Sequence, residues 1–122
     1  DPATTPNEYL LWYHRLPWDF RMPSGRTLWA ELARHYDRGV AEAERMHRDW
    51  AELAGFVDAE RHDQVAHYLA IQVREARWWR NACLAYFKER SGAPWPDGVE
   101  PPPHSLEYYR SLNFPHAPGD GR

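Results

Sequence analysis

The sequence is poor in cysteine, has no long hydrophobic run and shows no excess of positive charge. A single cysteine, Cys83, cannot form an intrachain disulfide, and its place on an apolar helix stripe indicates a buried side chain rather than a nucleophile. No run of about 18 apolar residues and no signal-peptide pattern occurs, so we expect a soluble segment without a membrane partner. The net charge of −3 offers no electrostatic footprint for nucleic acid.

Motifs for catalysis or metal binding are also missing. The seven histidines show no metal-ligand spacing, and no phosphate-binding glycine loop or nucleophile elbow occurs. Glu44 and His47 have the Glu-x-x-His spacing of di-iron bundles, but such a site needs a second pair and further buried glutamates. We interpret them as part of a solvated helix face with ion pairs from Glu44 to Arg48 and from Arg45 to Asp49. The sequence predicts no metal and no cofactor.

Tryptophan, by contrast, is abundant. The chain has seven tryptophans, 15% aromatic residues and 43% hydrophobic residues, which excludes a disordered chain and indicates an aromatic core, a contact surface or both. A length of 122 residues fits one domain, so residues 1–122 are predicted to form a single helical domain. The start at Asp1 without an initiator methionine suggests a fragment, whose compartment, cytoplasmic or secreted, would depend on the sequence upstream.

Residues 12–27, which we call the elbow, read W-Y-H-R-L-P-W-D-F-R-M-P-S-G-R-T. No helix or strand can run straight through this segment, because Pro17 and Pro23 each remove a backbone donor and restrict the residue before them. The candidate site residues in the elbow are Trp18, Asp19, Arg21 and Arg26. Asp19 has no partner acid in this stretch, so we favour a salt bridge to a neighbouring arginine, which would lock the elbow, over catalysis.

Helical signals flank the elbow on both sides. Thr5, Pro6 and Glu8 form a helix start, and this short N-terminal helix is predicted to end near residue 15. A second helix is predicted over residues 26–54, because apolar residues recur there at alternating gaps of three and four. This stripe comprises Trp29, Leu32, Tyr36, Gly39, Ala43, Met46, Trp50 and Leu53. We interpret Gly39 as allowing another helix to approach closely.

A third helix is predicted over residues 59–90. In the turn before it, Gly55 ends the preceding helix, Phe56 and Val57 fold back as its hydrophobic contact, and Asp58 caps the next helix. Because this turn is short, the two long helices form an antiparallel hairpin on the order of 40 Å long. The third helix carries two apolar stripes. The first comprises Val65, Leu69, Gln72, Ala76, Trp79, Cys83 and Tyr86, and the second comprises Tyr68, Ile71, Trp78, Ala82 and Ala85. One stripe packs against the second helix, and the other predicts a further partner.

The composition changes after the hairpin. Residues 91–103 are rich in proline and predicted to be extended, and a short helix capped by His104 or Ser105 follows over residues 106–112. The predicted fold is all-α: a long antiparallel helical hairpin with a short N-terminal helix, an irregular elbow, and a proline-rich C-terminal tail with one short helix.

Several long blocks of the sequence resemble a known family. They are E-Y-L-L-W-Y-H-R-L-P-W-D-F-R-M, S-G-R-T-L-W-A-E-L-A-R-H-Y-D-R-G-V, R-H-D-Q-V-A-H-Y-L, W-W-R-N-A-C-L-A-Y-F and H-S-L-E-Y-Y-R-S-L-N-F-P-H-A-P-G. In this order they are similar to the C-terminal region of the α-glucuronidases of glycoside hydrolase family 67. The resemblance implies the final helical part of a three-domain enzyme, whose (β/α)8 barrel removes 4-O-methyl-D-glucuronic acid from xylo-oligosaccharides with inversion. The acid and base carboxylates that inversion needs would lie in the barrel.

The resemblance therefore implies a non-catalytic segment of a xylan-degrading enzyme, with no catalytic residue in this chain. It further implies that the segment covers the catalytic barrel, supports a homodimer and meets xylo-oligosaccharide only through the parent enzyme. We interpret the elbow as the joint that docks on the barrel. From the residues alone, a free-standing helical protein-interaction module is an alternative. A sugar-binding module that uses Trp18, Phe20 and Trp95 is a third hypothesis.

Overall fold

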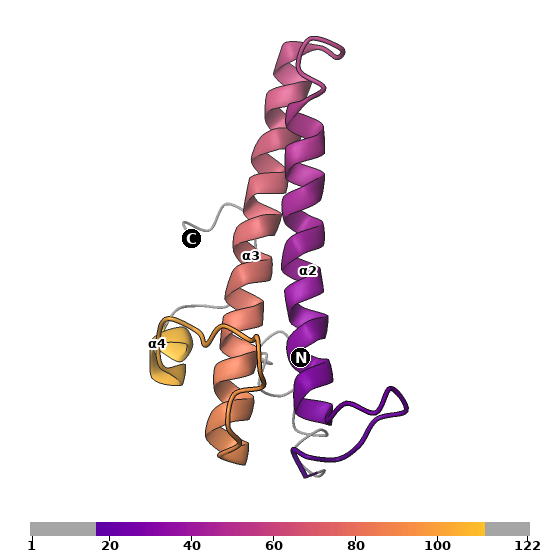
Figure 1. Ribbon diagram of the computed structural model, residues 1–122. Coiled ribbons are helices and arrows are strands. Elements are labelled where there is room, and N and C mark those ends of the chain that lie inside the picture. The colour runs from indigo at the N-terminus through magenta and orange to yellow at the C-terminus, as the bar shows by residue number, and fades with distance from the viewer. Residues whose placement is uncertain (1–16, 112–122) are drawn as a thin grey trace, which may run out of the picture.

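A computed structural model describes residues 17–111, which contain the helices α2 (Leu28–Ala51), α3 (Ala59–Ser91) and α4 (Leu106–Ser111). Helices α2 and α3 pack antiparallel as a long hairpin, and α4 lies beside α3 (Figure 1). Within residues 17–111 the regular elements are all helical, so the all-α prediction and the predicted hairpin are confirmed. The predicted N-terminal helix lies outside the described residues.

The ends of the long helices are set by side-chain caps and by a glycine. The hydroxyl oxygen of Thr27 accepts a hydrogen bond from the backbone N–H of Ala30 at 3.1 Å, and this cap begins α2. As predicted, a carboxylate oxygen of Asp58 accepts the N–H of Arg61 at 3.1 Å and caps α3. Helix α3 ends where Gly92 adopts a left-handed conformation (φ 65°), which is accessible to glycine at low cost.

The turn between α2 and α3 differs from the prediction. Helix α2 ends at Ala51, and Gly55 (φ 91°) lies inside the turn instead of directly after the helix. The N–H of Phe56 donates to the carbonyl oxygen of Leu53 at 3.0 Å, which closes a tight backbone turn. Phe56 is 81% exposed and Val57 is 40% exposed, so the prediction that they fold back onto the helix is wrong.

The hairpin is closed at this turn by Trp50 and His62. The indole Nε1–H of Trp50 donates to the carbonyl oxygen of His62 at 3.0 Å, and His62 Nε2 lies 2.8 Å from the carbonyl oxygen of Trp50. The two rings stack with centroids 5.3 Å apart. These reciprocal contacts fix the register of the two helices next to the turn.

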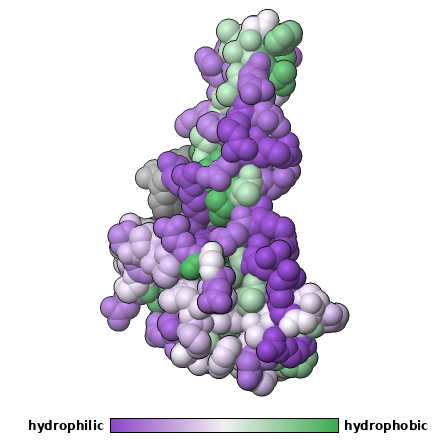
Figure 2. Space-filling view, in the orientation of Figure 1, coloured by the Kyte–Doolittle hydropathy of each residue, from purple (hydrophilic) through white to green (hydrophobic). Residues whose placement is uncertain are grey.

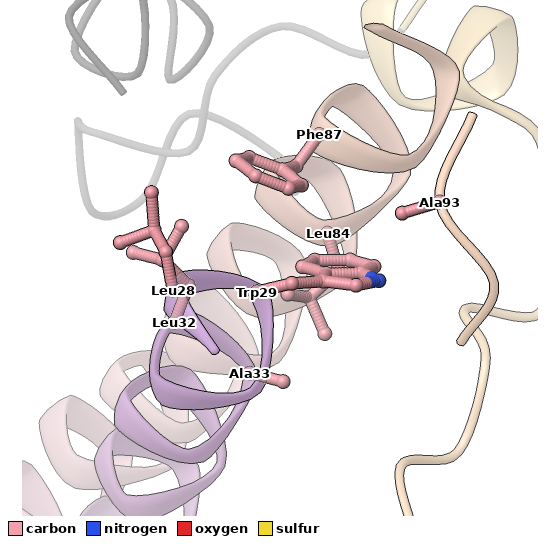
Figure 3. Packing of buried hydrophobic residues seen from close by; sticks show 7 residues of the cluster. All are labelled: Leu28, Trp29, Leu32, Ala33, Leu84, Phe87 and Ala93. Atoms are coloured by element: carbon pink, nitrogen blue, oxygen red, sulfur yellow. The ribbon is translucent and has the colours of Figure 1, made fainter. Parts of the chain in front are cut away.

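The hydrophobic core sits at the opposite end of the hairpin, which we call the base, where α2 begins and α3 ends. One buried cluster joins the start of α2, the end of α3 and the tail (Figure 3). Its members are Leu28, Trp29, Leu32, Ala33, Leu84, Phe87 and Ala93. A second cluster packs α4 onto α3 through Ala82, Cys83, Ala85, Tyr86, Leu106 and Tyr109. The base is therefore held by segments that are far apart in the sequence.

Helix α4 covers part of the second apolar stripe on α3. Ala82 and Ala85 belong to that stripe, and Leu106 and Tyr109 pack in the same buried cluster. Toward the turn the stripe is less covered, and Tyr68 is 52% exposed. The predicted further partner of this stripe is thus supplied in part by the chain itself.

The interpretation of Gly39 as a point of close helix approach is wrong. A Cβ atom placed on Gly39 would meet no heavy atom within 4 Å. Gly39 instead lies on the wall of an open groove between α2 and α3, whose opposite wall includes Gln72 and Trp79. The sequence periodicity identified the correct face of α2, but not the separation of the two helices.

Arg80 joins both long helices and the tail. Its guanidinium donates through Nε to Asp37 of α2 at 2.9 Å, through Nη1 to its neighbour Asn81 at 2.8 Å, and through Nη2 to the carbonyl oxygen of Glu100 at 2.6 Å. The side chain is 10% exposed. A buried guanidinium is stable only when its donors are paired, so these bonds pin the proline-rich tail to the hairpin.

Candidate docking site at the base of the hairpin

The described part of the elbow, residues 17–27, forms a small loop closed by backbone hydrogen bonds. The N–H of Met22 donates to the carbonyl oxygen of Arg26 at 2.9 Å, and the N–H of Leu28 donates to that of Phe20 at 2.7 Å. Gly25 occupies the turn with φ 89°, a conformation that costs other residues energy. The loop returns on itself and leads directly into α2. No helix or strand runs straight through residues 17–27, as the two prolines of this stretch predict.

Trp29 connects this loop to the proline-rich tail. Its indole Nε1–H donates to the carbonyl oxygen of Pro94 at 2.8 Å. The ring stacks on Phe87 with centroids 4.7 Å apart (Figure 3), and its centroid lies 5.2 Å from that of Trp95. Trp29 is 1% exposed, so its buried ring forms the contact through which the elbow and the tail pack together.

Between the elbow and the tail lies a hollow of about 400 Å³, which we call the elbow pocket. Its walls are residues of the elbow, the first turn of α2 and the tail. They are Trp18, Arg21, Gly25, Arg26, Thr27, Trp29, Ala30, Pro94, Trp95, Pro96 and Asp97. The pocket combines half-buried indole rings with exposed guanidinium groups, a composition typical of contact surfaces for proteins and ring-shaped ligands.

The two pocket arginines are positioned by local contacts. Arg21 donates from Nη1 to the carbonyl oxygen of Gly25 at 2.9 Å. Arg26 Nη1 lies 3.4 Å from a carboxylate oxygen of Glu31, which also accepts the Ser24 hydroxyl at 2.9 Å. The Ser24 hydrogen bond, together with Arg26, holds the pKa of Glu31 below its ordinary value. Both arginines are exposed and retain further N–H donors for a partner.

Three of the four predicted site residues come together in the elbow pocket: Trp18, Arg21 and Arg26. Asp19 is exposed and is not among the lining residues. Of the arginines near Asp19 in the sequence, Arg26 pairs with Glu31 and Arg21 binds backbone, whereas Arg15 lies outside the described residues, so the salt bridge to Asp19 stays a prediction.

The pocket also contains residues that the sequence interpretation did not assign to a site. Asp97 and Pro94 come from the tail, and Phe20, which was grouped with the ring-stacking candidates, does not line the pocket. The prolines on both sides of Trp95 indicate a conformationally restricted segment, but they do not indicate that this segment faces the elbow. Asp97 is the sole carboxylate among the lining residues.

The other chemical candidates of the sequence are engaged in structural contacts. Glu44 pairs with Arg77 of α3 instead of Arg48, which corrects that prediction, whereas the predicted pair of Arg45 with Asp49 is confirmed at 2.7 Å. Cys83 is fully buried, and burial raises the pKa of its thiol to about 12, so it is a core residue as predicted.

Residues 17–111 contain no group of three or more histidine, cysteine or acidic side chains arranged to hold a metal ion. Among the same residues, no helix combines the length and the hydropathy needed to cross a membrane.

Fold and pocket define an all-helical segment whose base carries a hollow lined by tryptophan and arginine side chains, and comparison with known proteins gives its family. Residues 1–100 match the glycosyl hydrolase family 67 C-terminus. The chain is 33% identical over 91 residues to alpha-glucuronidase A of Emericella nidulans, an alignment covering 75% of this chain and 11% of that protein. It is 30% identical over 105 residues to the alpha-glucuronidase of Hypocrea jecorina, covering 85% and 12%. The chain belongs to glycosyl hydrolase family 67, and it spans only about a tenth of the length of these relatives.

Proposed function

We propose that this chain is the non-catalytic C-terminal helical segment of a xylan-degrading α-glucuronidase. The parent enzyme would remove 4-O-methyl-D-glucuronic acid from xylo-oligosaccharides with inversion, through carboxylates outside this chain. The observation that carries the proposal is the elbow pocket, where exposed arginines and half-buried tryptophans surround a single carboxylate, Asp97. Together with the relatives, all named alpha-glucuronidases, this composition favours docking over chemistry.

In this proposal the elbow docks on the catalytic barrel of the parent enzyme. The base of the hairpin supplies a rigid platform, because Trp29 and Arg80 tie the elbow, the helices and the tail together. Guanidinium groups such as that of Arg21 suit a partner surface that presents carboxylates or backbone carbonyls, to which they can bind in a planar, bidentate manner. The helical segment then covers part of the barrel without contributing a catalytic group.

The proposal is tested by assaying the isolated 122-residue chain with aldouronic acids as substrates. No glucuronic acid is expected to be released, since a single pocket carboxylate cannot serve as both acid and base. Turnover by the isolated chain, lost in an Asp97→Asn variant, would overturn the assignment as a non-catalytic segment.

We also propose that the parent enzyme pairs as a homodimer through the hairpin. The base carries the packed core, whereas large hydrophobic side chains such as Met46, Phe56 and Tyr68 are exposed toward the turn, the end at which Figure 2 shows hydrophobic residues. An exposed apolar surface of this kind is typical of an interface with another protein. Sedimentation of the chain across a wide concentration range tests this step, and a monomer at every concentration would contradict it.

A sugar-binding role is a second candidate, favoured by the approach of Trp18 and Trp95 to one pocket. Indole rings can stack on the apolar faces of sugars. Calorimetric titration with xylo-oligosaccharides would then show heat that is lost in a Trp18→Ala variant. Absence of heat at millimolar ligand would dismiss this candidate and leave the docking role in place.

A further inference from the structure

The two arginines of the elbow pocket differ in how their charge is balanced. Arg26 pairs with Glu31, whereas Arg21 takes part in none of the ion pairs formed by residues 17–111. The Arg21 guanidinium donates from Nη1 to the carbonyl oxygen of Gly25 at 2.9 Å. A carbonyl oxygen accepts a hydrogen bond but does not neutralise the cation. Arg21 therefore keeps its positive charge and the N–H groups of Nε and Nη2 for a further acceptor.

The position of this guanidinium is fixed by its own loop. The backbone of Arg21 forms an antiparallel bridge with that of Thr27, and the side chain reaches across the loop to Gly25. Most exposed arginines lose conformational entropy when they bind a partner. Because the backbone and one guanidinium nitrogen of Arg21 are already held, a partner that binds the remaining N–H groups meets a smaller entropic cost.

Two indole rings stand beside this charge. Trp18 and Trp95 both line the elbow pocket and pack against the buried cluster of the base, yet each is only half-buried. Lys88, the sole lysine of the chain, has its Nζ atom 5.8 Å from the centroid of the Trp95 ring and donates to the Ala93 carbonyl oxygen at 2.6 Å. Apolar rings next to positive charge suit a group that is apolar at one end and anionic at the other.

Asp97 restricts how much negative charge the pocket can accept. It is the one carboxylate among the lining residues, and it would repel an anion that approached it. A single carboxylate that reaches Arg21 from an apolar segment therefore fits better than a run of acids. Carboxylates are the anions that protein surfaces present, and arginine binds them through two parallel hydrogen bonds.

We propose that the elbow pocket binds an aspartate or glutamate side chain of the catalytic barrel, with its carboxylate on Arg21. An apolar side chain next to that acid packs against Trp18 and Trp95. The proposal rests on the docking role proposed above and names the group that is docked. The chain spans about a tenth of the length of its relatives, so the rest of the parent enzyme is the partner that is always present beside this pocket.

Arg26 supplies a second donor to the same carboxylate. Its contact with Glu31 is 3.4 Å long, and its side chain is 49% exposed, so this pair contributes little to stability. Glu31 also accepts the Ser24 hydroxyl at 2.9 Å and keeps that hydrogen bond when Arg26 turns toward the partner. Arg26 can therefore exchange one carboxylate for another without leaving Glu31 unpaired.

Zero-length cross-linking identifies the docked group. Because Lys88 is the sole lysine, Arg21→Lys introduces one new amine, and it lies in the elbow pocket. A carbodiimide joins an amine to a carboxylate as an amide only where the two are in contact. In the complete parent enzyme, the new amine is expected to form a link with an aspartate or glutamate of the barrel, which mass spectrometry of the peptides identifies. The matched control is Arg38→Lys, an exposed position of α2 outside the pocket, and it is expected to give no such link.

Amide exchange measures the contribution of the charge. The exchange rate of residues 17–27 is measured in the isolated chain and in the complete enzyme, and the ratio of the two rates reports docking. Arg21→Gln is expected to reduce this ratio by about tenfold or more, because it removes the cation that faces the partner's carboxylate. Arg21→Lys keeps the charge and is expected to retain most of the ratio, and the control Arg38→Gln all of it. Loosening of the loop itself appears in both proteins and cancels in the ratio.

The outcomes separate this proposal from the docking role. If the elbow is protected in the complete enzyme to the same extent with Arg21→Gln, and the new amine links only to acids of its own chain or to none, the bound carboxylate is excluded and docking stands. Equal losses of protection in Arg21→Gln and Arg38→Gln would likewise exclude a specific contact at Arg21. No protection of the elbow in the unmodified complete enzyme would overturn docking and this proposal together.

Discussion

Trp29 is the residue on which the base of the molecule depends. It stands at the first turn of α2, yet its ring contacts Phe87 near the end of α3 and Trp95 in the tail, and its indole N–H binds the Pro94 carbonyl. One side chain thus links three segments that the sequence separates. This explains why a chain with an exposed hairpin shaft still has a well-packed core.

Replacing Trp29 with phenylalanine is expected to lower the free energy of unfolding by about 1–3 kcal/mol, through the lost hydrogen bond and the smaller ring. Urea denaturation measures this difference. A matched control is Phe20→Leu, which changes an exposed aromatic residue of the elbow and is expected to alter stability by less than about 0.5 kcal/mol. Equal effects at the two positions would contradict the central role of Trp29.

Cys83 provides a probe of the interface between α3 and α4, because it lies in the buried cluster that joins them. Burial raises the pKa of its thiol from 9.0 to about 12, so the native protein is expected to react very slowly with thiol reagents at pH 8 and rapidly in denaturant. Because the buried thiol is held neutral, its contribution to the free energy of unfolding is complete below pH 9. This contribution is lost as the pH rises toward 12, where the thiol ionises in the folded state as well. Fast labelling of the native chain would show that the interface opens at the base.

At the scale of elements, the sequence predicts the two long helices of the hairpin but not the distance between them. Regular spacing of apolar residues predicts both long helices, and Asp58 caps α3 as expected, because these signals are local. The elbow pocket could be predicted only in part. Trp18 and Arg21 were identified, but Asp97 joins them through packing across most of the chain, which no local pattern encodes. Gly39 was misjudged because periodicity gives a face and not a distance.

The open space at Gly39 leads to a prediction about α2. Gly39→Ala is expected to stabilise the dilute, monomeric chain by about 0.5–1 kcal/mol, because alanine favours the helix and its methyl group meets no clash. Thermal or urea denaturation at low concentration measures the gain. Destabilisation would mean that another helix packs directly on this position.

The link between the tail and the hairpin is tested through Arg80. Arg80→Lys is expected to cost about 1–3 kcal/mol, because an ammonium group cannot reach Asp37 and the Glu100 carbonyl together. Amide exchange should accelerate in residues 93–100 more than in α2. The matched control is Arg77→Lys, whose exposed pair with Glu44 is expected to contribute less than about 1 kcal/mol. Similar losses in the two variants would contradict the clamp.

At the scale of the whole molecule, the two ends of the hairpin differ in what they offer. The base is packed, rigid and bears the elbow pocket, while the shaft and turn expose hydrophobic residues such as Met46 and Phe56. In the proposed function, the base docks on the catalytic barrel and the shaft contacts a second copy of the chain. Two surfaces for partners are expected of a chain that spans about a tenth of the length of its α-glucuronidase relatives. Among the described lining residues, the elbow pocket has one acid, Asp97.

The most direct test of docking is amide hydrogen exchange in residues 17–27, compared between the isolated chain and the complete parent enzyme. If the elbow docks on the barrel, amides such as those of Asp19 and Arg21, which lie on exposed residues of the loop, are expected to exchange at least about tenfold more slowly in the complete enzyme. Residues 106–111 of α4 serve as the internal reference. Identical exchange of the elbow in both proteins would contradict the proposal that it is the joint between this segment and its enzyme.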